Sequence, residues 1–117
     1  MRTILVVDDE SSMRFLLRMI LESAGYEVVE APHGAAALER AKESPPDLVV
    51  TDLMMPVMNG RDLVGRLRAD PETARIPILL ISANPHADVA AVDAIVGKPF
   101  HPEAVVEAAR SLAGSGG

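Results

Sequence analysis

Three carboxylates in this sequence stand directly after short apolar runs that have the character of buried strands. Asp8 and Asp9 follow Thr3–Val7, and Asp52 follows Leu48–Thr51. Ionised groups are costly away from water, so carboxylates at the mouths of buried strands need a chemical reason. Because close carboxylates repel one another by roughly 1 to 4 kcal/mol per pair at about 4 Å, a divalent cation would stabilise such a cluster. An all-oxygen site without His or Cys favours Mg²⁺, and we expect Asp9 to bind it directly, with Asp8 acting partly through water.

Two further polar residues follow strand candidates in the same way. Ser82 follows Ile78–Ile81, and Lys98-Pro99 follows Ala94–Gly97. The carboxyl ends of parallel strands meet at one edge of a sheet, so these side chains should converge with the carboxylates. Each feature alone has a commoner role, because an Asp-Asp pair often caps a helix and a serine often occupies a turn. The specific signal is their order and their shared position at strand ends.

Apolar strand candidates alternate with helical stretches along the chain. Strands are predicted at Thr3–Val7, Tyr26–Glu30, Leu48–Thr51, Ile78–Ile81 and Ala94–Gly97. Helices are predicted at Ser11–Ala24, Ala35–Lys42, Arg61–Ala69 and Glu103–Leu112. Gly25 is placed to end the first helix, and Asn59-Gly60 to turn the chain into the third. Strict alternation of strands and helices indicates an α/β fold, in which helices cover both faces of a parallel sheet.

One connection is too short for a helix of ordinary length. Only Asn84–Val92 is available between the fourth and fifth strands, and Pro85 stands near its start. Helices of about two turns are marginal without packing. We therefore expect a shortened helix here, which would be the fourth helix along the chain and would precede the one predicted at Glu103–Leu112.

Length and composition predict one globular domain. The chain has 117 residues, of which 49% are apolar, no cysteine and a formal net charge of −6. The length allows one core, the missing cysteines exclude disulfides and thiolate metal sites, and the charge argues against a broad nucleic-acid surface. The first apolar run is too short for a signal peptide or a membrane span, so we expect a cytoplasmic protein. We expect the domain to cover residues 1–113 and the Gly/Ser tail, residues 114–117, to be flexible.

In order and spacing, these motifs resemble the receiver domain of two-component response regulators, in particular single-domain regulators of the chemotaxis type. The residues that carry the resemblance are Asp8-Asp9, Asp52–Gly60 (Asp-Leu-Met-Met-Pro-Val-Met-Asn-Gly), Ser82 and Lys98-Pro99-Phe100. The resemblance implies a flavodoxin-like, doubly wound five-stranded sheet in the order 2-1-3-4-5, and a cis peptide before Pro99. It also implies a sensor histidine kinase or a histidine phosphotransfer protein as partner, and a further output protein that receives the signal.

The resemblance assigns roles to individual residues. Mg²⁺ would be held by the carboxylates of Asp8, Asp9 and Asp52 and by the backbone carbonyl of Met54. Asp52 would attack phosphorus and become an aspartyl phosphate, which Lys98 and the Ser82 hydroxyl would stabilise. Such a protein carries out chemistry on itself, so it is a signalling module and no conventional enzyme.

Two departures from the family pattern concern the output of the signal. Receivers usually have an aromatic residue three positions before the lysine, and here that position is Ile95. The connection between the fourth and fifth strands is also shorter than usual. We therefore hypothesise that phosphorylation orders or shifts Ala83–Val92 through the Ser82 hydroxyl. The same departures leave an alternative open, a receiver-like scaffold that binds partners without being phosphorylated.

The first helix offers a candidate partner surface. Its core arc is predicted to comprise Met13, Leu16, Leu17, Ile20, Leu21 and Ala24, and its solvent stripe Arg14, Arg18 and Glu22. Phe15 and Met19 lie just outside the core arc, where polar residues would be expected. They are either peripheral core packing or a docking patch for the kinase or phosphotransfer protein.

A metabolic enzyme on the same architecture is the third possibility. Dehalogenase-type phosphatases need Asp-x-Asp after the first strand, where this chain has Asp8-Asp9-Glu10. Flavodoxins need a glycine-rich phosphate loop at that place, and Glu10-Ser11-Ser12 contains no glycine. No Walker loop occurs in the sequence, so this class of function is disfavoured.

Overall fold

The computed structural model describes residues 2–53, 58–83 and 91–114, which form five strands and four helices. In chain order these are β1 (Thr3–Val7), α1 (Ser11–Ser23), β2 (Glu27–Ala31), α2 (Gly34–Glu43), β3 (Leu48–Asp52), α3 (Gly60–Ala69), β4 (Ile78–Ser82), β5 (Ala94–Gly97) and α4 (Pro102–Ala113). Each boundary lies within one residue of the one predicted from the sequence. The alternation of strands and helices is therefore confirmed.

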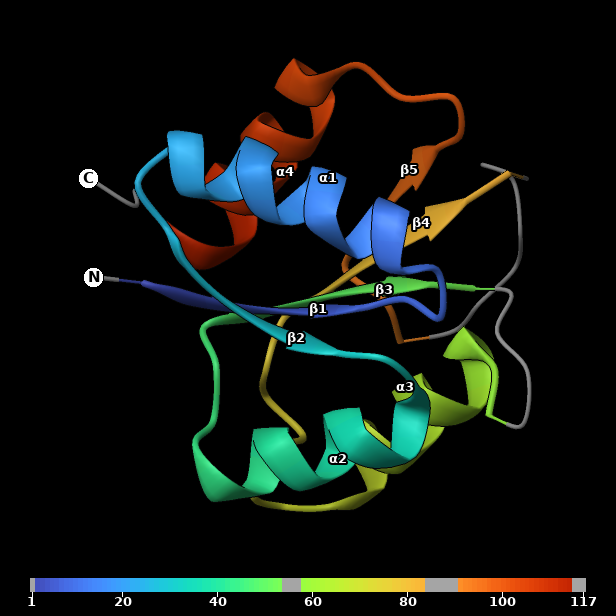
Figure 1. The fold of residues 1–117 in the computed structure, drawn as a ribbon. Helices are drawn as coiled ribbons and strands as arrows, with labels where there is room; N and C mark the ends of the chain where they lie inside the picture. The colour runs from blue at the N-terminus through green and yellow to red at the C-terminus, as the bar shows by residue number, and fades with distance from the viewer. Residues whose placement is uncertain (1, 54–57, 84–90, 115–117) are drawn as a thin grey trace.

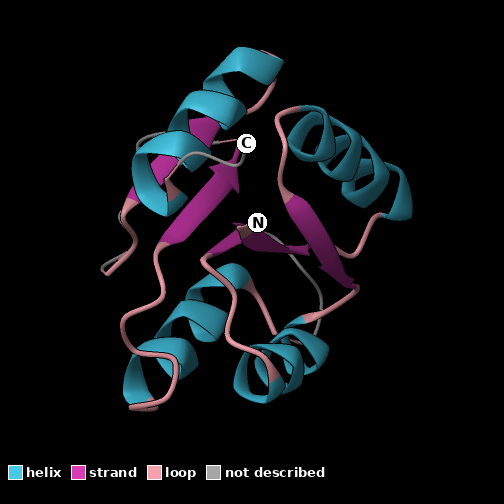
Figure 2. Cartoon of the chain, turned by 90° about the vertical axis from the view of Figure 1, so that its left-hand side faces the viewer, coloured by secondary structure: helices cyan, strands magenta, loops and turns pink. Residues whose placement is uncertain are grey.

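The described strands form one parallel sheet in the order β2-β1-β3-β4-β5. Helices α1 and α4 cover one face of this sheet, and α2 and α3 cover the other (Figure 1). Figure 2 shows the same arrangement from the side of the chain ends, with a pair of helices on each side of the strands. This is the predicted flavodoxin-like, doubly wound fold. The carboxyl ends of the strands point away from the two chain ends, to the right in Figure 1.

Alternating side chains along the central strand divide the core between the two faces of the sheet. On β1, Ile4 and Val6 pack in the cluster that contains residues of α1 and α4, whereas Leu5 and Val7 pack in the cluster that contains residues of α2 and α3. All four side chains are at most 2% exposed. A strand covered on both faces has no need of polar alternation, which explains its continuous apolar sequence. The core holds the strand ends in fixed positions.

The second strand begins one residue later than predicted. Gly25 has a φ of +96° and ends α1, as expected for a glycine in the left-handed region. Tyr26 still belongs to this turn, because its backbone N–H donates to the Leu21 carbonyl and its hydroxyl donates to the Gly114 carbonyl. Pairing with β1 therefore starts at Glu27.

Several sequence predictions fall wholly or mostly outside the described residues. These are the short helix expected at Asn84–Val92, the hypothesised movement of Ala83–Val92 and the Gly/Ser tail beyond Gly114. Gly114 itself is described, and it caps α4. All of them stay predictions, as does the domain boundary at residue 113. Within the described ranges, no helix combines the length and the apolar character that crossing a membrane requires.

Candidate functional site

The register of the sheet brings the three predicted carboxylates together. Val7 of β1 pairs with Thr51 of β3, so the residues that follow them, Asp8 and Asp52, are neighbours across the two strands. One carboxylate oxygen each from Asp8, Asp9 and Asp52 lie within 4.8 Å of one another. Asp8 and Asp52 are buried and Asp9 is exposed. The cluster therefore extends from the edge of the sheet to solvent.

Asp8 is the most deeply buried of the three acids, with 1% of the residue exposed. Its carboxylate accepts a hydrogen bond from the Glu10 backbone N–H at 2.9 Å. Burial raises the pKa of Asp8 to about 6, the charges of Asp52 and Asp9 add to this effect, and the Glu10 N–H and Lys98 oppose it. A nearby cation would favour the ionised form of such a group.

Lys98 brings a positive charge to the cluster. Its Nζ lies 3.0 Å from Oδ2 of Asp52, whose side chain is 8% exposed. The Lys98 backbone N–H donates to the Ser82 carbonyl at 2.8 Å, which continues the pairing of β4 and β5 beyond Gly97. The peptide between Lys98 and Pro99 is cis, as the resemblance implied.

Ser82 ends β4 next to the same edge and is 2% exposed. Asp52 pairs with Ile81, so the serine is the next residue along the strand beside Asp52. The structure thus brings together five of the six predicted site residues, namely Asp8, Asp9, Asp52, Ser82 and Lys98. The remaining one, Met54, lies outside the described residues.

The donor set at this edge fits Mg²⁺. It consists of carboxylate oxygens, the ligands that this ion prefers, and in the described chain the cluster contains neither histidine nor thiolate. Even with Lys98 in contact with Asp52, the pKa of Asp8 stays at about 6. Burial is the main cause of this raised pKa, and the neighbouring carboxylates add to it, so a divalent cation at the cluster would favour the ionised form of Asp8.

A glycine lets α3 begin directly against the end of β3. A Cβ atom on Gly60 would lie 2.5 Å from the Asp52 carbonyl oxygen and 2.8 Å from the Leu53 Cα. Both are backbone atoms, which cannot move aside as a flexible side chain can. The Gly60 N–H also donates to the Leu53 carbonyl at 2.8 Å. Gly60 thereby determines how closely α3 approaches the backbone of Asp52.

Gly60→Ala is expected to lower the free energy of unfolding by about 2 kcal/mol or more, because the backbone beside Asp52 must shift to accept the methyl group. Gly65→Ala in the same helix is the matched control, since no atom lies within 4 Å of its added Cβ. Alanine is favoured over glycine inside a helix by about 1 kcal/mol, so the control should be stabilised. Urea unfolding of both variants measures the difference, and equal stabilities would contradict this role of Gly60.

One contact at the site was missed from the sequence. Arg14 was predicted to lie on the solvent stripe of α1, yet its side chain is only 17% exposed. It donates to the Asp8 carbonyl at 2.6 Å and pairs with Glu30 of β2 at 3.3 Å. The prediction was wrong because helical periodicity takes no account of the neighbouring strand. The sequence feature that could have predicted this contact is Glu30 near the end of β2, which offers an acidic partner to the arginines of α1.

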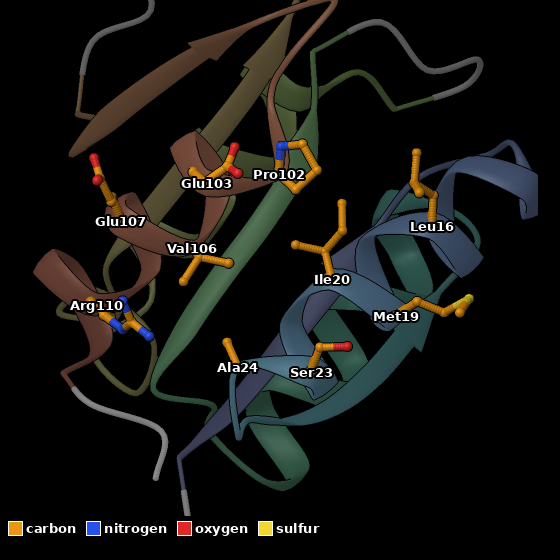
Figure 3. Close-up of a pocket in the computed structure, with 10 residues that line it drawn as sticks. All are labelled: Leu16, Met19, Ile20, Ser23, Ala24, Pro102, Glu103, Val106, Glu107 and Arg110. Carbon is orange, nitrogen blue, oxygen red and sulfur yellow. The ribbon is translucent and has the colours of Figure 1, made fainter.

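Helices α1 and α4 form an open apolar groove on the face they share. Ile20 of α1 and Val106 of α4 point toward one another across it (Figure 3). Leu16 was predicted to lie in the core but is 45% exposed beside this groove, because α4 leaves that part of α1 uncovered. Phe15 and Met19 are 60% and 51% exposed. Their exposure favours a docking patch over peripheral core packing.

Comparison with known proteins agrees with the geometry of the site. Residues 4–110 match the profile of the response regulator receiver domain family. The chain is 50% identical over 82 residues to the sensor histidine kinase TmoS of Ectopseudomonas mendocina, a match that covers 70% of this chain and 8% of that protein. It is 38% identical over 112 residues to the chemotaxis protein CheY of Thermotoga maritima, covering 92% of this chain and 93% of that protein. A similar solved structure is the receiver domain of the sensor histidine kinase PA1611 from Pseudomonas aeruginosa PAO1, which has a magnesium ion coordinated in its active site cleft. Its TM-score is 0.90 at 25% identity, over 97% of this chain and 98% of that one.

Proposed function

Because the chain belongs to the response regulator receiver domain family of two-component signalling, it is a phosphoacceptor module of that system, and we propose that Asp52 accepts the phosphoryl group. The observation that supports this assignment is the surroundings of Asp52. It is a buried carboxylate with Lys98 Nζ at 3.0 Å, and it shares a cluster with Asp8 and Asp9. A carboxylate between a metal-binding acid pair and a fixed cation is suited to attack phosphorus.

The proposed transfer exchanges one bond to phosphorus for another. A carboxylate oxygen of Asp52 bonds to phosphorus while the bond from phosphorus to the imidazole nitrogen of a phosphohistidine breaks, and the imidazole leaves with the electron pair. The product is an acyl phosphate on Asp52. Water later attacks the phosphorus, which releases inorganic phosphate and restores the carboxylate. The reaction needs positioning and charge neutralisation more than it needs a protein base.

The other site residues would bind the metal and the phosphoryl group. We assign Mg²⁺ to the carboxylates of Asp8, Asp9 and Asp52 and to the backbone carbonyl of Met54. When bound, the ion neutralises charge on the phosphoryl oxygens. The Lys98 ammonium would neutralise a second oxygen, and the Ser82 hydroxyl would donate a hydrogen bond to a third.

The proposed phosphodonor is a histidine kinase or a histidine phosphotransfer protein, since receiver domains act with these proteins. Helix α1 begins three residues after Asp8 and exposes Phe15, Leu16 and Met19, so a docking patch on this helix remains our prediction. A cytoplasmic location also remains a prediction. The scaffold alternative loses support, because a scaffold has no need of an acid cluster, a buried serine and a lysine at one edge of the sheet.

Phosphorylation by acetyl phosphate, a small donor that needs no kinase, tests the proposed function. We expect the wild-type protein to gain one phosphoryl group in the presence of Mg²⁺ and to stay unmodified when a chelator removes the metal. Failure to react under both conditions would contradict the proposal.

A further inference from the structure

A network of charged side chains connects the acid pair to α1 and β2. Arg14 Nη1 donates to the carbonyl oxygen of Asp8 at 2.6 Å, and Arg14 Nε lies 3.3 Å from Oε1 of Glu30. The second oxygen of Glu30 accepts a hydrogen bond from Arg18 Nη1 at 2.7 Å. A guanidinium is planar, so two contacts through different nitrogens fix its orientation. Arg14 is thus held against Asp8 by a strand that belongs to another part of the chain.

The carbonyl that Arg14 contacts belongs to the peptide group between Asp8 and Asp9. Because a peptide group is planar, fixing this oxygen also fixes the direction in which the chain continues to Asp9. Asp8 is held from two further sides, by its N–H donating to the Ala31 carbonyl at 3.3 Å and by its carboxylate accepting from the Glu10 N–H. Asp9 is exposed. The position of its carboxylate therefore depends on the backbone that precedes it.

We propose that Arg14 is a positioning residue, which fixes the Asp8–Asp9 peptide so that both carboxylates face one Mg²⁺ ion. The inference rests on the proposed function, because it concerns the same metal site. Charge alone predicts the opposite effect, since a guanidinium near the site repels a cation and its removal would tighten binding. Glu30 reduces this repulsion by pairing with the guanidinium. The sign of the change in Mg²⁺ affinity therefore distinguishes positioning from charge.

The test is the dissociation constant for Mg²⁺ of Arg14→Ala and Arg18→Ala, measured by isothermal titration calorimetry. Both variants remove one positive charge from α1 and one ion pair with Glu30, but only Arg14 contacts Asp8. We expect Arg14→Ala to raise the dissociation constant roughly tenfold, as loss of an outer contact to a metal ligand typically does, and Arg18→Ala to change it by less than about twofold. Equal changes in both variants, or tighter binding by Arg14→Ala, would overturn the inference.

Phosphorylation kinetics give a second readout, which general destabilisation would not produce. The Mg²⁺ concentration needed for half the maximal rate should rise in Arg14→Ala by the same factor as the dissociation constant. The maximal rate should change less, because Arg14 contacts no reacting atom.

If Arg14→Ala does not fold, as judged by circular dichroism, Arg14→Lys and Arg18→Lys replace the pair. A lysine has one side-chain nitrogen in place of the two through which Arg14 contacts Asp8 and Glu30, so the same difference is expected. A wild-type protein that binds no Mg²⁺ would contradict the proposed function. If the wild type binds Mg²⁺ and Arg14→Ala binds it equally well, only this inference is contradicted.

Discussion

Asp8→Asn is expected to make the metal-free protein more stable than the wild type at pH 7. The wild-type residue is 1% exposed and lies beside Asp52 and Asp9, so the fold disfavours its charged form. An amide keeps the shape of the carboxylate and can still accept the hydrogen bond from Glu10. The expected gain in the free energy of unfolding is on the order of 1 to 2 kcal/mol after allowance for solvent screening, which raises the melting temperature by about 4 °C or more.

The pH dependence of this gain follows from the pKa of Asp8, which is about 6 in the folded protein against 3.8 for an ordinary aspartate. Below pH 3.8 the Asp8 carboxyl is protonated in both the folded and the unfolded protein, so its ionisation does not change the free energy of unfolding. As the pH rises toward 6, the unfolded chain loses this proton before the folded protein does, so the contribution of Asp8 to stability falls. Above pH 6 Asp8 is ionised in both states, so its unfavourable effect on the free energy of unfolding no longer changes with pH. The difference between Asp8→Asn and wild type should therefore grow across this range and then stay constant.

Asp62→Asn is the control for this prediction, because Asp62 is exposed in the first turn of α3. An acid there is favourable to the helix, so its loss should leave stability unchanged or slightly lower. Millimolar Mg²⁺ should raise the melting temperature of the wild type, since a ligand that binds only the folded state stabilises it, and should raise that of Asp8→Asn less. Calorimetric melting curves across pH measure these effects. Parallel pH profiles for wild type and Asp8→Asn would show that the buried charge has no such effect.

Lys98→Met is expected to lower stability and to slow phosphorylation. The lysine ammonium lies 3.0 Å from Asp52, so its removal leaves a buried carboxylate without this cation. The expected loss in the free energy of unfolding is about 1 to 3 kcal/mol, less than for a fully buried pair because the lysine side chain is partly exposed. The rate of phosphorylation by acetyl phosphate should fall on the order of 100-fold, because the proposed contact of Lys98 with the transferring phosphoryl group is lost.

Lys42→Met controls for the loss of a lysine as such. Its ion pair with Asp70, at 3.2 Å, has a lysine side chain that is 50% exposed, and such pairs contribute at most about 1 kcal/mol. Adding Asp52→Asn to Lys98→Met should recover most of the lost stability, since the buried carboxylate that Lys98 contacts is then also removed. Urea unfolding of these variants measures both effects. A Lys98→Met protein as stable as Lys42→Met would rule out a strong coupling between Lys98 and Asp52.

The sequence contains enough information to predict the fold and the group of residues that share an edge of the sheet. Apolar runs such as Leu48–Thr51 and breakers such as Gly25 placed each described element within one residue of its position. Asp52, Ser82 and Lys98 could be grouped because the carboxyl ends of parallel strands meet at one edge. The structure confirms that these residues converge, and their chemical roles stay predictions.

Contacts between elements could not be predicted in the same way. The periodicity of one helix indicates an apolar side but does not specify which neighbour covers each part of it. The periodicity assigned Arg14 to solvent, although β2 provides Glu30 as its partner, and it assigned Leu16 to the core, although the groove beside α4 leaves it exposed. Gly60 was predicted only as a turn residue. Its closeness to the Asp52 backbone depends on how α3 meets β3, which the sequence motif does not express.

The intact mass of the protein after incubation with acetyl phosphate and Mg²⁺ tests the central claim most directly, when wild type and Asp52→Asn are measured side by side. The wild type should gain the mass of one phosphoryl group. Asp52→Asn should gain none, because the amide is a poor nucleophile and no other carboxylate of the described cluster has a lysine ammonium in contact with it. An unmodified wild type, or a variant modified to the same extent, would contradict the assignment of Asp52 as the phosphoacceptor.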